Sequence, residues 1–255
     1  MHNPIIIGGK MKVNKAVYCF LVCFVITFST VVAFALTPEE ILKKADIVRS
    51  PFETFVMDVD IMSPQGNMSF KVYSKREKGM LVLFLKPAGQ KGRLLLRNGE
   101  DLWIYMPGTH RPFKLTETQR LIGGISNGDM ARLRWSTDYN AKQIREDEKS
   151  YELELISKNN STTYYRIEIL IEKHSFKPLR SKAYLQSGKL YKTIYYSGFE
   201  SFSGKLMSTN LKFIDHLRNE EESKMVFSNI RYQEIPENYF NIDALPGLSK
   251  TLNEK

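Results

Sequence analysis

Apolar and polar residues alternate in run after run from residue 55 onward, and this period of two constrains the fold more than any other feature. In residues 55–61, phenylalanine, methionine, valine and isoleucine stand at every second position, and residues 68–72 repeat the pattern after a Pro-Gln-Gly-Asn turn at 64–67. Side chains of a strand point alternately to opposite faces. The two runs therefore predict a β-hairpin with one apolar face.

The same strand composition recurs along the rest of the chain. The further runs are 80–85, 93–96, 102–106, a short run near 113, 151–156, 164–172, 179–185, 190–197, 208–216 and 224–232. Short turns between neighbouring runs favour an antiparallel meander. We expect about eleven or twelve strands and a β content far above the roughly 20–25% of an average globular protein.

One strong helix signal precedes the strands. The Thr-Pro-Glu-Glu sequence at 37–40 combines a capping threonine, a proline at the first helical position and a glutamate three residues after the cap. Apolar residues at 41, 42, 45 and 48 follow at helical spacing. The pattern predicts an amphipathic helix over residues 38–49.

Two strand runs, 80–85 and 102–106, are apolar on both faces, so one face of the sheet needs a cover. The candidates are the helix over 38–49 and the glycine-containing segment 116–137, where the alternation is lost. A strongly curved sheet with helices over its mouth would satisfy this pattern. We therefore predict a mainly β protein.

The first 35 residues have the features of a signal peptide. Lysines at 10, 12 and 15 precede an apolar run over 16–34, which ends in the small-x-small sequence Ala33-Phe34-Ala35. We predict cleavage after Ala35 and one mature domain over 36–255. The same segment could instead be kept as an anchor, since its apolar run is close to the roughly 20 residues that a spanning helix needs.

Cleavage would change the composition of the folded chain. Cys19 and Cys23 both lie in the leader, and neither follows the small residue of a lipoprotein signal, so we expect no lipidation and no thiol in the mature protein. The three leader lysines account for part of the net charge, which falls from +9 to +6. This modest charge allows an acidic lipid surface or acidic partner, whereas no clustered basic tract indicates nucleic acid.

No motif in the sequence indicates catalysis or metal binding. His110, His174 and His216 are far apart and lack a paired ligand spacing, and there is no nucleophile elbow, phosphate-binding loop or dinucleotide fingerprint. The acid pair Asp58 and Asp60 alternates with an apolar face, as expected of a solvated outer face. We predict a non-enzymatic protein without cofactor or metal.

The aromatic residues allow two interpretations. The chain has 13 tyrosines, 15 phenylalanines and 2 tryptophans, many of which alternate along predicted strands. Such residues can fill a packed core. On the concave side of an open sheet they can also line a dry cavity that holds an acyl chain.

Four segments resemble one known family. They are the helix opening at 37–40, Asp-Leu-Trp-Ile-Tyr-Met-Pro at 101–107, Gly-Ile-Ser-Asn-Gly-Asp-Met-Ala-Arg at 124–132 and Ile-Pro-Glu-Asn-Tyr-Phe at 235–240. Over nearly the whole mature chain, the sequence is similar to the outer-membrane lipoprotein-sorting (LolA-like) proteins. The resemblance implies an unclosed, strongly curved antiparallel sheet, a half-barrel of about eleven strands, with helices that cover a hydrophobic cavity.

The resemblance also implies residues for the site. The expected cavity lining is Phe70, Phe84, Leu94, Leu96, Trp103 and Tyr105, and the expected lid is Leu121, Ile122, Ile125, Asp129 and Arg132. Arg49 is expected to tie the first helix to the sheet through a hydrogen bond that opens on loading. If the lining is right, Leu96→Glu should abolish lipid uptake while the protein stays folded.

The predicted function is that of a periplasmic carrier, expected to be a monomer, that binds lipid or lipoprotein acyl chains for sorting or transport toward the outer membrane. Its partners would be acyl chains and an inner-membrane transporter. The length and the Ser-Asn-Gly-Asp segment are similar to a branch associated with resistance-nodulation-division-type lipid exporters. The alternative is a non-enzymatic sensor or accessory interaction module of such a transporter. An enzyme and an outer-membrane barrel are less favoured.

Overall fold

The computed structural model describes residues 35–131, 135–159 and 162–254. The predicted signal peptide, apart from Ala35, and the predicted lid residue Arg132 lie outside these residues. Within the described residues, no helix is long and apolar enough to cross a membrane.

The first described helix, α2 (Pro38–Arg49), begins at the predicted capping box. The Thr37 hydroxyl accepts a hydrogen bond from the Glu40 amide at 3.2 Å, and the Glu40 carboxylate accepts one from the Thr37 amide at 2.8 Å. The bond from the Thr37 amide, with a second one from the Thr37 hydroxyl, holds the pKa of the Glu40 carboxyl below its ordinary value. The helix buries its apolar stripe against the sheet, where it packs on β9, β12 and β14.

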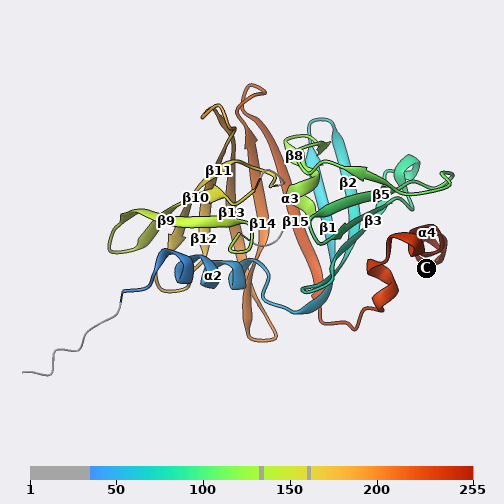
Figure 1. Cartoon of the computed structure of the whole chain (residues 1–255), viewed down its shortest axis with the longest axis horizontal. Coiled ribbons are helices and arrows are strands. Elements are labelled where there is room, and N and C mark those ends of the chain that lie inside the picture. Colours follow the sequence, from blue (N-terminus) through green and yellow to red (C-terminus); the bar gives the residue numbers. More distant parts are fainter. Residues whose placement is uncertain (1–34, 132–134, 160–161, 255) are drawn as a thin grey trace, which may run out of the picture. The chain divides into compact units, whose positions relative to one another are not determined.

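One antiparallel sheet of 13 strands contains most of the chain and is not closed into a barrel. In spatial order its strands are β6 (Phe113–Leu115), β5 (Asp101–Tyr105), β4 (Leu94–Asn98), β3 (Gly79–Lys86), β2 (Gly66–Lys75), β1 (Thr54–Ser63), β15 (Glu221–Arg231), β14 (Lys205–Asp215), β13 (Leu190–Phe202), β12 (Pro178–Tyr184), β11 (Arg166–Glu172), β10 (Ser150–Ser157) and β9 (Tyr139–Glu146). Two meanders meet where β1 pairs with β15 (Figure 1). The predicted mainly β, unclosed antiparallel fold is confirmed.

The sheet has one strand that the sequence pattern did not predict. Strand β9 forms an edge, and polar residues occupy positions on both of its faces. Its sequence therefore lacks the apolar alternation by which the other strands were recognised. A separate two-stranded sheet, β7 (Arg120–Ile122) and β8 (Ile125–Ser126), leads into the short helix α3 (Asn127–Ala131).

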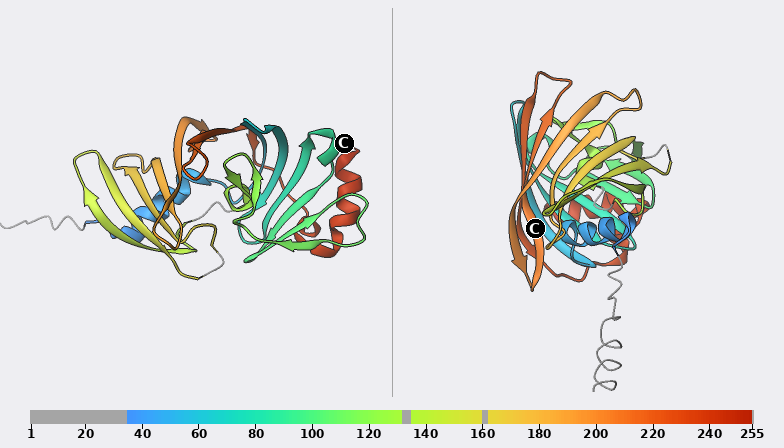
Figure 2. Two further views of the ribbon diagram at one scale, coloured as in Figure 1. Left: turned by 90° about the horizontal axis from the view of Figure 1, so that it is seen from above. Right: turned by 90° about the vertical axis from the view of Figure 1, so that its left-hand side faces the viewer.

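Strand register divides the side chains into two faces. Cross-strand partners share a face, so Phe213 of β14 lies on the same side as Ser223 and, through further pairs, as Val59 and Phe70. We call this side the inner face, because α2 and the β7–β8 turn lie against it. Figure 2 shows the sheet curving around these elements.

The C-terminal segment covers part of the outer face. It consists of the short helices η3 (Glu237–Phe240) and η4 (Ile242–Ala244) and the helix α4 (Leu245–Asn253), which pack against β3, β4 and β5 (Figure 2). The Asn98 amide donates to the Phe240 carbonyl at 3.0 Å, and the Ser249 hydroxyl donates to the Gly92 carbonyl at 2.6 Å. The strands with two apolar faces thus have a cover that the sequence prediction had not assigned. One further short helix, η2 (Ala88–Gln90), joins β3 to β4.

Candidate functional site

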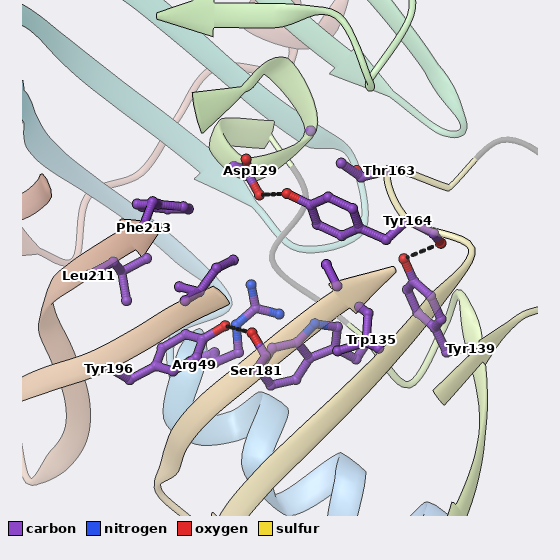
Figure 3. Close-up of a pocket in the computed structure, with 14 residues that line it drawn as sticks. Arg49, Asp129, Trp135, Tyr139, Thr163, Tyr164, Ser181, Tyr196, Leu211 and Phe213 are labelled. Atoms are coloured by element: carbon purple, nitrogen blue, oxygen red, sulfur yellow. Dashed lines mark hydrogen bonds between the residues drawn. The ribbon is translucent and has the colours of Figure 1, made fainter. Parts of the chain in front are cut away.

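A cavity of about 40 Å³ lies between the end of α2, the helix α3 and the inner face of β9–β14 (Figure 3). Its wall is mainly apolar. Ile167, Ala183, Ile194, Leu211 and Phe213 come from four successive strands. The pairs Ile167 with Ala183 and Ile194 with Phe213 stand directly opposite each other in the register, so the alternation of the sequence alone places these side chains in one surface.

Arg49, the last residue of α2, points into this cavity (Figure 3). Its guanidinium carbon lies 3.6 Å from the centre of the Trp135 ring. The nearest carboxylate oxygen in an ion pair is Oδ1 of Asp46 at 4.0 Å, beyond hydrogen-bonding distance. Nη1 of Arg49 is buried and has no hydrogen-bond partner among the described residues. In the structure Arg49 thus stacks on Trp135, and its buried Nη1 makes no hydrogen bond to the sheet among the described residues.

Asp46 joins α2 to the chain that precedes β9. Its two oxygens accept hydrogen bonds from the Trp135 amide at 2.9 and 3.0 Å and from the Ser136 amide at 2.7 Å. Burial raises the pKa of the Asp46 carboxyl, while Arg49 and these amides act in the opposite direction. Asp46 thus fixes the segment whose Trp135 ring supports the Arg49 guanidinium.

A second buried network holds α3 on the sheet. Nζ of Lys192, which is fully buried on β13, lies 2.5 Å from Oδ2 of Asp129 and donates to the Tyr164 hydroxyl at 2.8 Å. Tyr164 donates to Oδ1 of Asp129, and Ser126 donates to Oδ2 through its amide and its hydroxyl. Burial, then the Asp129 charge, raises the pKa of Tyr164 well above its ordinary value. Of the predicted lid residues that the structure describes, Asp129 alone lines the cavity, and its pair with Lys192 ties α3 to β13.

The other described lid residues lie in the β7–β8 hairpin. Ile125 is fully buried, whereas Leu121 and Ile122 are half-buried, and none of the three lines the cavity. Gly123 adopts a φ of +55°, and a Cβ there would lie 2.7 Å from the Ser63 Cβ. The hairpin turn is thus seated directly on the inner face, and only glycine fits there.

The predicted cavity residues fall on both faces of the sheet. Phe70 and Phe84 lie on the inner face, with ring centres 4.9 Å apart, but they are packed on β2 and β3 outside the cavity. The other four pack under the C-terminal segment on the outer face: Leu94, Leu96, Trp103 and Tyr105. The six therefore do not line one cavity. In β4 apolar side chains occupy both faces, so the sequence offered no alternation by which to choose one.

Several cavity residues were not singled out from the sequence. They are Trp135, Tyr139, Thr163, Tyr164, Ile167, Ser181, Ala183, Ile194, Tyr196, Leu211 and Phe213. One signal could have pointed to this half of the sheet. Lys192 shares a strand face with Ile194 and Tyr196, and a lysine on an apolar strand face indicates a buried charge with a partner.

Comparison with known proteins shows to which family the chain belongs. A family model described only as "Uncharacterized protein" matches residues 76–246, and no curated protein matches the chain. Among solved structures, a LolA superfamily protein from Nitrosomonas europaea is similar with 32% identity and a TM-score of 0.76. The match covers 82% of this chain and 99% of that one.

Two more distant structures share the fold. A domain from Vibrio parahaemolyticus described as an outer membrane lipoprotein-sorting protein has 18% identity and a TM-score of 0.69, over 82% of this chain and 98% of its own. A DUF1329 family protein from Desulfovibrio piger has 22% identity and a TM-score of 0.70, over 82% of this chain and 100% of its own. These two show the fold, and the identity and coverage of the Nitrosomonas protein show that this chain belongs to the LolA superfamily.

Proposed function

We propose that this protein is a periplasmic carrier that binds a lipid or lipoprotein acyl chain against the inner face of β9–β14 and moves it toward the outer membrane. The observation that carries the proposal is the apolar cavity between α2, α3 and the sheet. The printed description of the Vibrio relative, an outer membrane lipoprotein-sorting domain, supports the same class of function. The predicted signal peptide supports export.

At its size in this structure, the cavity is too small for an acyl chain. At about 40 Å³ it has room for a few water molecules. Loading therefore requires α2 or α3 to move away from the sheet, which is a shift between a closed empty population and an open loaded one. Ten methylene groups buried in the opened space would contribute roughly 8 kcal/mol to that shift.

The contacts that close the cavity are of a kind that can be broken and remade. Three backbone hydrogen bonds to Asp46 connect α2 with the segment before β9, and the Asp129–Lys192 pair connects α3 with β13. Neither connection belongs to the strand ladder of the sheet. The helices can therefore move while the 13 strands stay paired.

Native mass spectrometry tests the function directly. The exported chain would be isolated from the periplasm of a Gram-negative host without detergent, and its mass compared before and after lipid extraction. We expect a stoichiometric adduct whose extracted component is a phospholipid, a fatty acid or an acylated peptide. An empty chain that takes up no added lipid contradicts the proposal, and a co-purifying protein on the empty chain would favour the interaction module.

A further inference from the structure

The acidic groups around the cavity are already engaged. Asp129 is paired with the buried ammonium of Lys192 and accepts hydrogen bonds from Ser126 and Tyr164. The oxygens of Asp46 accept three hydrogen bonds from backbone amides. Burial raises the pKa of the Asp46 carboxyl, and its nearest approach to the Arg49 guanidinium is 4.0 Å.

Arg49 is not engaged in the same way. Its stacking on Trp135 occupies one face of the guanidinium and leaves the N–H donors, which lie in the guanidinium plane, free to bond. Nη1 is buried without a hydrogen-bond partner among the described residues, although a buried charged donor normally has one. Figure 3 shows the guanidinium projecting into the cavity, away from the helix.

Two hydroxyl groups lie on the wall near this cation. Ser181 and Tyr196 share a hydrogen bond of 3.1 Å and both line the cavity (Figure 3). Either oxygen can be the donor in this pair, so one hydroxyl hydrogen can be turned toward a bound acceptor. Beyond them the lining is apolar and includes Ile194, Leu211 and Phe213.

We propose that the cavity selects an acyl chain with an acidic head, whose carboxylate or phosphate oxygens pair with the Arg49 guanidinium while the chain lies along the apolar wall of β11–β14. This inference rests on the proposed carrier function and names its ligand class. The hydroxyl pair of Ser181 and Tyr196 offers the acidic head a further hydrogen-bond donor. A planar guanidinium matches both kinds of acid through two parallel hydrogen bonds.

Binding of three single-chain probes tests the inference. Oleate, oleyl phosphate and oleyl alcohol have the same chain and differ in the head, and each would be titrated by calorimetry into the delipidated exported protein at pH 8. We expect at least one of the two acids to bind at least about tenfold more tightly than the alcohol. Which acid binds more tightly identifies the carboxylate or the phosphate as the natural head.

Two variants assign the preference to one cation. Arg49→Gln should bring the ratio of acid to alcohol affinity close to one, and Arg49→Lys should retain part of it. Arg166→Gln is the matched control, because Arg166 also stacks on an aromatic ring, 3.7 Å from the centre of Tyr184, but lies on the opposite face of the sheet. This control should leave the ratio unchanged.

The outcomes separate this inference from the function on which it rests. Equal affinity of the wild-type chain for acids and alcohol overturns the acidic-head inference and leaves the carrier function standing. A preference that survives in Arg49→Gln also overturns it. If the wild-type chain binds none of the three probes, the carrier function itself fails. The wild-type comparison needs no variant, so it holds even if Arg49→Gln does not fold.

Discussion

Lys192 shows how a single side chain links the lid to the sheet. It is fully buried on β13, and its partner Asp129 on α3 is 4% exposed at the side chain. An ion pair in such a setting contributes little over an apolar pair, but a charge left alone there is costly. The two residues therefore have to be considered together.

Lys192→Met is expected to destabilise the protein by roughly 3–5 kcal/mol, because the substitution leaves the Asp129 carboxylate buried without its cation. The double variant Lys192→Met with Asp129→Asn should recover much of this loss, since both charges are removed together. Urea unfolding of both variants measures the difference. A single variant within about 1 kcal/mol of the wild type would show that the pair does not hold α3.

At the scale of elements, the outer cover of β3–β5 changes the expected effect of one substitution. Leu96 is fully buried and lies with Leu81 and Leu94 beneath α4, not beside the cavity. Its neighbour Leu95 faces the inner side, where it pairs with Val82 and Ile104. We therefore no longer expect Leu96→Glu to leave the protein folded and abolish lipid uptake; we expect it to destabilise the fold.

Leu96→Glu should destabilise the fold by at least about 3 kcal/mol, because a carboxylate would enter an apolar layer without a partner. Leu96→Met is the matched control and should cost less than about 1.5 kcal/mol, since it conserves volume. Thermal unfolding with a lipid-binding assay distinguishes the two accounts. A stably folded Leu96→Glu that has lost lipid binding would support the original placement of the cavity.

The sequence predicts those parts of the fold that depend on neighbouring residues, and it does not predict those that depend on packing. The capping box of α2 and the strands with clear alternation depend on neighbouring residues, and they appear where expected. The face of β4 and the presence of β9 depend on what packs above them, which alternation does not encode. The cavity joins Arg49, Trp135 and strands far apart in the chain, so its residues became visible only through strand order.

At the scale of the whole described domain, the two sides of the sheet have different covers. The C-terminal segment makes a continuous apolar layer on the outer face of β3–β5. The inner face of β9–β14 is covered by the apolar stripe of α2 and, around a small cavity, by polar connections from α2 and α3. We infer that the inner side opens and the outer side remains packed.

Photolabelling with a diazirine-bearing fatty acid would show which side of the sheet receives the chain. After irradiation of the loaded chain, peptide mass spectrometry locates the modified residues, with unlabelled oleate as competitor. We expect labels on Trp135 and on inner-face residues such as Ile194 and Phe213, all suppressed by oleate. Competed labels concentrated instead on Leu96 and Trp103, beneath α4, would contradict it.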